Sequence, residues 1–113
     1  MFNKHRNNDI KAQNAYELIT INRSNTEFII LDVRTPEEYS EAHIENAENI
    51  DYNSRTFKEE LEKRDKKIKY LVYCRSGHRS SNAVKVMIKL GFIDLHNLSG
   101  GIRKWKKEDL PLV

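Results

Sequence analysis

The sequence predicts an α/β fold in which a central, mostly parallel sheet of four to five strands carries helices on both faces. Two short and nearly continuous apolar runs, over residues 28–33 and 70–73, have the composition of strands that are buried on both sides. Stretches with apolar residues at helical spacing separate and follow them. Because strands alternate with helices, crossover connections and a parallel sheet are expected.

The length of 113 residues suits one compact domain, which is expected over residues 10–113. Residues 1–9 are polar and no apolar segment follows them, so a flexible tail is expected there and not a secretory signal. A first helix is expected over residues 12–21, where Ala15 and Leu18 recur at helical spacing.

Two helix starts follow the first buried strand. Thr35 fits an N-cap and Glu38 the reciprocal position of a capping box, so a short helix is expected to run to about Ala42. Thr56 offers a second capping box, for a helix that ends near Arg64.

The rest of the chain continues the alternation of strands and helices. Gly91 is expected to end an amphipathic helix as its C-cap, and Gly100 and Gly101 are expected to form a tight turn before a last helix. The elements expected here are, in order, a weak strand over residues 47–50, the strand over 70–73, the helix over 80–90, a short strand over 95–98 and a helix over 102–107.

Composition and charge argue against several classes of function. The 20 basic and 17 acidic residues are interleaved, as on a solvated helix surface, so no nucleic-acid partner is expected. No run approaches the roughly 18 apolar residues that span a bilayer, so no membrane association is expected. Four scattered histidines and one cysteine match no metal-ligand spacing, and neither a metal nor a cofactor is expected. A lone cysteine forms no internal disulfide, and a cytoplasmic location is expected.

The lone cysteine, Cys74, is the candidate nucleophile. It directly follows a buried strand, at the carboxyl end where parallel sheets bind their ligands. A free thiol titrates near ~8.5, so a reactive cysteine needs a stabilised thiolate. A tight loop between a strand and a helix provides this when its backbone N–H groups converge on one point.

The residues after the cysteine suit such a loop. Gly77 permits the backbone angles that converging N–H groups require. Arg75, His78 and Arg79 place positive charge near the sulfur, which lowers the thiol pKa and attracts anionic donors. Ser80 is expected to be the N-cap of the following helix.

Three segments of the chain resemble signatures of the rhodanese family. The loop that begins at Cys74 has the form Cys-Arg-Ser-Gly-x-Arg-Ser, which is common among single-domain members. The other two segments, in the family's order along the chain, are Leu31-Asp32-Val33-Arg34 followed by Glu37-Glu38-Tyr39 and His43-Ile44, and Leu98-x-Gly100-Gly101-x-x-x-Trp105. Together they extend over most of the chain, so the resemblance implies a single rhodanese-like domain.

The resemblance implies a sulfurtransferase that carries sulfur as a persulfide on Cys74. The thiolate would attack the outer sulfur of a small anionic donor such as thiosulfate, and a thiophilic acceptor would then remove that sulfur. The acceptor is cyanide in the laboratory and a thiol or a protein in the cell. A monomer or a weak dimer is expected. The implied substrate-binding residues of the loop are Arg75, Ser76, Gly77, His78 and Arg79.

Two departures from the family pattern concern the donor. Two-domain relatives that use thiosulfate carry a lysine where this chain has Ser76, and a substrate-binding arginine where it has Glu38. Two cationic anchors are missing, so thiosulfate is expected to bind weakly and a persulfide to be the better donor. Ala42 and Asn46 replace glycines beside the signature histidine and are expected to be local backbone adjustments.

Asp32 and Arg34, at the end of the neighbouring strand, are expected to brace loops near the sulfur through hydrogen bonds. For Arg79 two roles stay open, namely substrate contact and a structural pair with an acidic residue such as Asp32. Trp105 is expected to cover the core, and His43 to be a hydrogen-bonded structural residue.

Two other functions are weighed against sulfur transfer. Cysteine phosphatases and arsenate reductases need Cys-x5-Arg to enclose a tetrahedral oxyanion, whereas Cys74 and Arg79 form Cys-x4-Arg, one residue shorter. A sulfur-carrier subunit or an interaction module with little turnover of its own is the second alternative. Stoichiometric persulfide formation with little thiosulfate:cyanide activity would support it.

Overall fold

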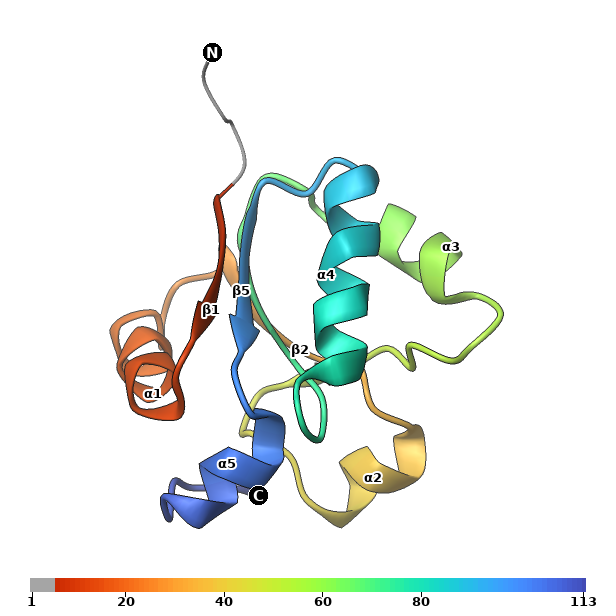
Figure 1. Ribbon diagram of the computed structural model, residues 1–113. Helices are drawn as coiled ribbons and strands as arrows, with labels where there is room; N and C mark the ends of the chain where they lie inside the picture. Colours follow the sequence, from red (N-terminus) through yellow and green to blue (C-terminus); the bar gives the residue numbers. More distant parts are fainter. Residues whose placement is uncertain (1–5) are drawn as a thin grey trace.

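The computed structural model describes residues 6–113, which form one five-stranded parallel sheet with five helices around it (Figure 1). The strands lie side by side in the order β1-β5-β4-β2-β3, and every neighbouring pair is parallel. Along the chain the elements are β1 (Arg6–Ile10), α1 (Ala12–Ile21), β2 (Phe28–Asp32), α2 (Pro36–Glu41), β3 (Glu48–Asn49), α3 (Phe57–Glu62), β4 (Lys69–Tyr73), α4 (His78–Lys89), β5 (Asp94–Leu98) and α5 (Gly101–Lys107).

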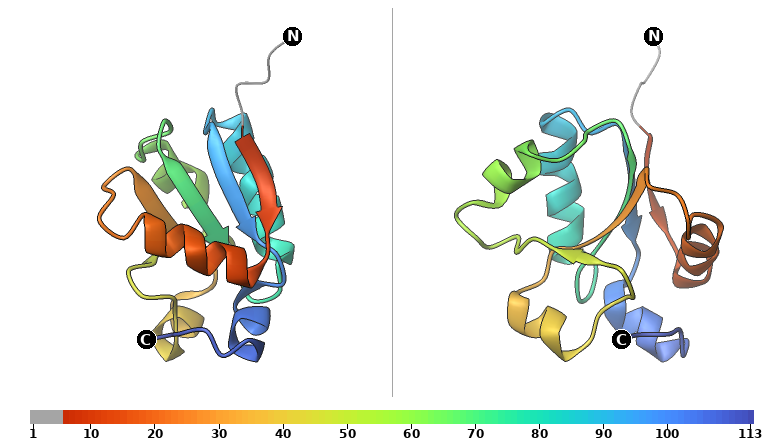
Figure 2. Two further views of the ribbon diagram at one scale, coloured as in Figure 1. Left: turned by 90° about the vertical axis from the view of Figure 1, so that its left-hand side faces the viewer. Right: turned by 180° about the vertical axis from the view of Figure 1, so that it is seen from behind.

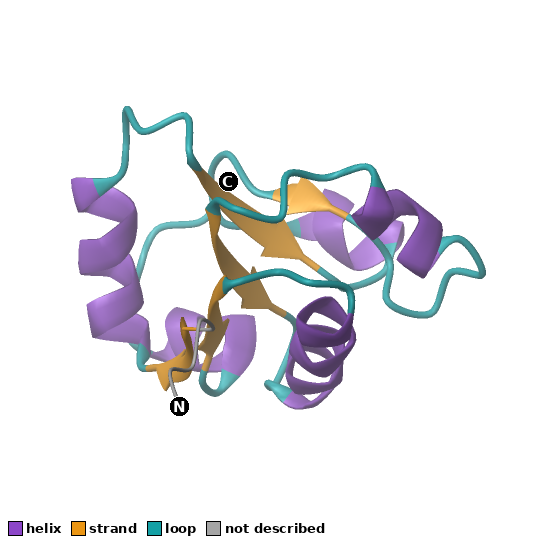
Figure 3. Ribbon diagram, turned by 90° about the horizontal axis from the view of Figure 1, so that it is seen from above, coloured by secondary structure: helices purple, strands orange, loops and turns teal. Residues whose placement is uncertain are grey.

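Helices cover both faces of the sheet, as predicted, with α3 and α4 on one face and α1 and α5 on the other (Figures 2 and 3). Central strand β4 contributes side chains to the hydrophobic core on each face of the sheet, because successive side chains of a strand point to opposite faces. Tyr70 and Val72 pack with α3 and α4, whereas Leu71 and Tyr73 pack with α1 and α5. All four side chains are fully buried, which accounts for the continuous apolar run in the sequence.

The capping box predicted before α2 is present. The Thr35 side chain accepts a hydrogen bond from the Glu38 backbone N–H at 3.2 Å, and the Glu38 carboxylate accepts one from the Thr35 N–H at 3.1 Å. These bonds satisfy two backbone groups that a helix end leaves free, so the cap sets where α2 begins.

The expected tail over residues 1–9 is wrong for residues 6–9, which belong to strand β1; residues 1–5 lie outside the described residues. Strand β1 pairs in parallel with β5 at the edge of the sheet, and the Asn97 side chain donates a hydrogen bond to Asp9 at 3.1 Å. Backbone pairing with β5 compensates for the polar composition of this strand. Among residues 6–113, no helix has the length and apolar character needed to cross a membrane.

One predicted helix start and one predicted capping box need correction. Helix α4 begins at His78 with Gly77 at its N-cap, so Ser80 is not the N-cap but a buried residue of the first turn. Left-handed backbone at Gly77, with φ of 104°, lets the helix begin this early. Thr56 is the N-cap of α3, but no capping box forms. Its side chain accepts no hydrogen bond from the first turn of the helix, and its hydroxyl donates to Glu60 at 3.0 Å.

Candidate active site

Cys74 lies at the carboxyl end of β4, in the four-residue loop that leads into α4 (Figure 1). Its side chain is 1% exposed and packs in the core layer formed with α3 and α4. The two elements that flank the loop therefore fix the sulfur at the edge of the sheet where parallel sheets bind ligands.

Hydrogen bonds from the loop and the first turn of α4 stabilise the thiolate of Cys74. The Gly77 backbone N–H donates to the sulfur at 3.1 Å. Burial alone would raise the pKa of Cys74, but the Ser80 hydroxyl and the backbone N–H groups of Ser80, Gly77 and Ser76 together lower that pKa below its ordinary value. The thiol is thus enclosed and yet prone to ionise, and a stabilised thiolate is what a cysteine nucleophile requires.

Ser80 contributes to this effect from inside the helix. Its side chain is fully buried, and within residues 6–113 no partner satisfies hydrogen-bond geometry for its hydroxyl oxygen. This hydroxyl is among the groups that lower the pKa of Cys74, so it favours the thiolate over the thiol. From the sequence, Ser80 was expected near the site as a helix N-cap and not as a group that lowers the pKa of Cys74.

The start of α5 holds the outer side of the loop. The Ile102 N–H donates to the carbonyl of Cys74, and the Arg103 N–H to the carbonyl of Arg75, each at 3.0 Å. Gly101 permits this approach, since a Cβ built on it would lie 2.4 Å from the Arg75 carbonyl oxygen. With these two carbonyls directed at α5, the N–H groups of the loop remain directed at the sulfur.

The cationic residues of the loop differ in their surroundings. Arg75 and His78 are exposed. Arg79 forms a two-pronged ion pair with Glu38, with nitrogen–oxygen distances of 2.8 and 3.0 Å. An acidic partner for Arg79 was one of the two roles predicted, but that partner is Glu38 and not Asp32.

Asp32 and Arg34 form a buried ion pair with each other. The Arg34 guanidinium donates to both carboxylate oxygens at 2.7–3.1 Å and also to the carbonyl of Ala42 at 2.6 Å. The guanidinium also lies 5.6 Å from the ring centre of Tyr73. These bonds tie the loop after β2 to the end of α2, the type of contact that bracing requires.

The remaining predicted residues lie in structural positions. His43 Nδ1 is 2.8 Å from the Tyr39 carbonyl, and the two rings stack at 3.8 Å. Trp105 is 1% exposed and donates to the Pro111 carbonyl at 2.9 Å.

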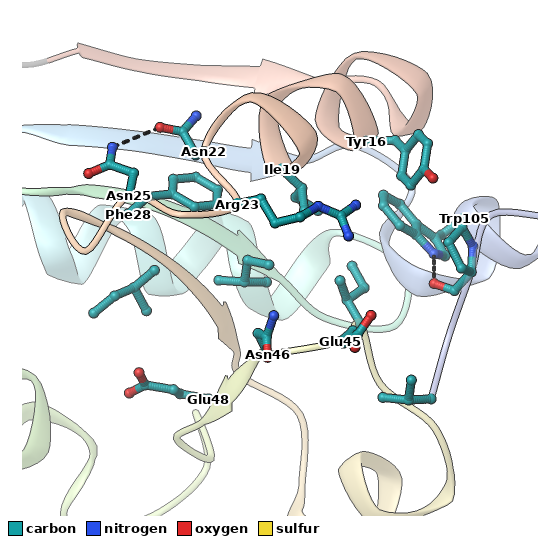
Figure 4. Close-up of a pocket in the computed structure, with 15 residues that line it drawn as sticks. Tyr16, Ile19, Asn22, Arg23, Asn25, Phe28, Glu45, Asn46, Glu48 and Trp105 are labelled. Atoms are coloured by element: carbon teal, nitrogen blue, oxygen red, sulfur yellow. Dashed lines mark hydrogen bonds between the residues drawn. The ribbon is translucent and has the colours of Figure 1, made fainter.

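A cavity of about 210 Å³ lies away from Cys74, on the face of the sheet that carries α1 (Figure 4). Its lining includes Tyr16, Ile19 and Trp105, with the Arg23 side chain directed across it. Sequence reasoning did not anticipate this cavity, because its walls come from segments far apart in the chain.

The matching family model is that of the rhodanese-like domain, which covers residues 12–108 of the chain. This chain belongs to the rhodanese-like domain family. Its predicted signatures therefore lie in a domain of that family, and the predicted fold class is confirmed.

Relatives of this rhodanese-like chain include both a curated protein and solved structures. Thiosulfate sulfurtransferase GlpE of Coxiella burnetii (strain RSA 331 / Henzerling II) is 34% identical over 92 residues, which is 81% of this chain and 80% of that protein. A rhodanese-related protein from Thermoplasma volcanium has a TM-score of 0.80 at 32% identity, covering 96% of this chain and 98% of that one. A rhodanese-like domain protein from Staphylococcus aureus has a TM-score of 0.70 at 31% identity, covering 86% and 89%.

Proposed function

We propose that this protein is a sulfurtransferase in which Cys74 accepts a sulfane sulfur from a donor and passes it to a thiophilic acceptor. The observation that carries the proposal is the buried sulfur that accepts a hydrogen bond from the Gly77 N–H at 3.1 Å. Family membership and the similarity to GlpE support sulfur transfer as the general chemistry.

In the first half-reaction the Cys74 thiolate attacks the outer sulfur of the donor. A sulfur–sulfur bond forms at the cysteine while the sulfur–sulfur bond of the donor breaks. Thiosulfate then leaves as sulfite, and a persulfide donor leaves as a thiolate. The donor's electron pair leaves with the departing group, so no oxidant, reductant or proton is consumed.

In the second half-reaction the acceptor attacks the outer sulfur of the Cys74 persulfide. Cyanide leaves as thiocyanate, a thiol leaves as a persulfide, and the cysteine thiolate is restored. The proposal requires no separate general base, because the N–H groups that stabilise the thiolate lie beside the sulfur that would carry the persulfide. Kinetics of the ping-pong type follow from this order.

The ion pair of Arg79 with Glu38 argues against the phosphatase alternative. A cysteine phosphatase needs its loop arginine to enclose the oxyanion, whereas both prongs of this guanidinium bind a carboxylate. Turnover of an arylphosphate that depends on Cys74 would overturn this view.

The experiment is intact-mass measurement of the reduced protein after incubation with thiosulfate or with a small persulfide. One added sulfur on the wild type, absent from Cys74→Ser and removed by cyanide, is the expected result. Failure to load from either donor would sink the proposal. Loading without turnover to cyanide or a thiol would mark the protein as a carrier that works with a partner.

A further inference from the structure

We propose that Glu38 is a specificity-determining residue, which neutralises Arg79 beside the sulfur and so disfavours dianionic donors such as thiosulfate relative to monoanionic persulfides. This inference rests on the sulfur transfer proposed above and names the donor class of that same site. Glu38 lies 36 positions before Cys74 in the chain, on helix α2, whereas the loop that holds Cys74 leads into helix α4.

The geometry directs both prongs of Arg79 away from a free anion. Its two terminal nitrogens bind the two carboxylate oxygens of Glu38 at 2.8 and 3.0 Å, in the two-pronged arrangement by which a guanidinium binds oxyanions in general. Arg79 lies in the first turn of α4, five positions after Cys74. Glu38 is the main cause that raises the pKa of its guanidinium, burial opposes this, and a charged Cys74 adds a smaller increase. Arg79 is therefore placed where it could bind an anionic donor, but Glu38 already neutralises its charge.

Glu38 itself is held in place by the N-terminus of α2. Its Oε1 accepts hydrogen bonds from the backbone N–H and the hydroxyl of Thr35, each at 3.1 Å. With the Arg79 hydrogen bond as the largest cause, its pKa is lowered to about 2, so the carboxylate is ionised at any pH where the enzyme would work. The carboxylate of Glu38 is therefore negatively charged at working pH, and its hydrogen bonds hold it in one position.

A second cation near the loop is also neutralised. Arg34, the buried arginine after β2, is paired with Asp32 at 2.7 Å. The other basic residues of the loop and the first turn of α4 are Arg75 and His78, and both are exposed to solvent, which screens charge. A site of this kind attracts anions weakly, and it favours a donor that brings one negative charge over a donor that brings two.

The decisive variant is Glu38→Gln, because the amide keeps an oxygen for the Thr35 cap and removes the charge. With thiosulfate we expect kcat/KM to rise about tenfold, and with the persulfide of 2-mercaptoethanol about threefold, since a dianion gains twice the Coulomb energy of a monoanion. Both gains are expected to shrink at high salt. The matched control is Glu37→Gln, which removes an exposed carboxylate next to it and should change either donor by less than about twofold.

The partner variants separate a charge effect from a structural one. Arg79→Gln leaves Glu38 unpaired and should lower kcat/KM for thiosulfate about tenfold, while Glu38→Gln with Arg79→Gln restores the net charge and should return it to within about twofold of wild type. Thermal melting checks that each variant is folded. A loss of activity in Glu38→Gln, or a double variant that does not recover, would overturn the proposal.

Failure of this inference is distinguishable from failure of the proposed function. A wild type that gains no sulfur from either donor in the mass measurement contradicts sulfur transfer itself, and the inference falls with it. A wild type that gains sulfur, together with a Glu38→Gln variant whose preference between the two donors is unchanged, contradicts the inference alone.

Discussion

At the scale of single residues, the state of Cys74 depends on two opposing effects. Burial disfavours the thiolate, while the Ser80 hydroxyl and three backbone N–H groups favour it and determine the net direction of the pKa shift. The backbone groups cannot be removed by mutation without altering the loop. Ser80 is therefore the one contributor that a side-chain substitution can test.

Ser80→Ala is expected to raise the pKa of Cys74 toward its ordinary value, because the Ser80 hydroxyl is the side chain that lowers this pKa in the wild type. The pH dependence of alkylation by iodoacetamide measures this shift, and the curve should move to higher pH. Ser81→Ala, one position further along α4, is the control. Equal curves for wild type and Ser80→Ala would contradict a role for this hydroxyl.

Asp32→Ala is expected to lower stability and activity together. It leaves the guanidinium of Arg34 buried without its partner, a change that costs about 3–5 kcal/mol. Thermal melting and the sulfur-loading assay measure the two effects, with Glu17→Ala on an exposed part of α1 as the control. If loading is lost while the melting temperature is unchanged, Asp32 acts on the donor and not as a brace.

At the scale of elements, the site depends on how closely α5 approaches the loop between β4 and α4. Two N–H groups of α5 bind the carbonyls of Cys74 and Arg75, and the contact is close enough to exclude any side chain at Gly101. The helix is thus part of the site although it supplies no side chain to the sulfur in the proposed mechanism.

Gly101→Ala is expected to destabilise the fold by about 3–5 kcal/mol, combining left-handed backbone strain with a methyl group that meets the Arg75 carbonyl at 2.4 Å. The control is Gly91→Ala, which also has positive φ but meets its nearest atom at 3.8 Å and should cost about 1–2 kcal/mol. Chemical denaturation measures both. Equal losses would mean that close packing against the loop is unimportant.

Elements with apolar periodicity were predictable, and those that depend on distant partners were not. Helix α1 begins and ends at the predicted residues, because its apolar spacing is a local property. Strand β1 escaped prediction since its five residues, Arg-Asn-Asn-Asp-Ile, contain a single apolar side chain and it depends on backbone pairing with β5. Ser80 was misplaced because Gly77 starts α4 one turn early.

At the scale of the whole molecule, the ion pair between Glu38 and Arg79 links α2 to α4 and should affect acid stability. The folded-state pKa of Glu38 is about 2, below its ordinary value of 4.5. The stabilisation is therefore complete above pH 4.5 and is lost as the pH falls toward 2. We place it at about 1–2 kcal/mol, after allowance for solvent around a side chain that is 25% exposed.

Chemical denaturation of wild type and Glu38→Gln across pH 7 to about 2 measures this contribution. The wild type should be more stable at neutral pH, and the difference should vanish as the carboxylate protonates. Glu37→Gln controls for the loss of one negative charge. A difference that stays constant over the whole range would show that ionisation of Glu38 does not stabilise the fold.

The overall fold and the place of the candidate nucleophile after a buried strand were accessible from the sequence, whereas the charge balance around the sulfur was not. The buried strands and the loop at Cys74 are each formed by one contiguous segment of the sequence, so they could be predicted. Arg79 and Glu38 lie 41 positions apart, and the sequence offers many acidic residues as partners. Only the fold, which brings Glu38 of α2 to Arg79 of α4, selects one of them.

The edge pair of the sheet also has a consequence for how the protein is made. Strand β1 is synthesised first, but its partner β5 lies 88 positions later in the chain. A ribosome must therefore translate most of the domain before this pair can form, and the remaining strands have to assemble without it. Pairing between strands so far apart in the sequence slows folding. Until β5 is synthesised, the nascent chain exposes strand β1 without its partner.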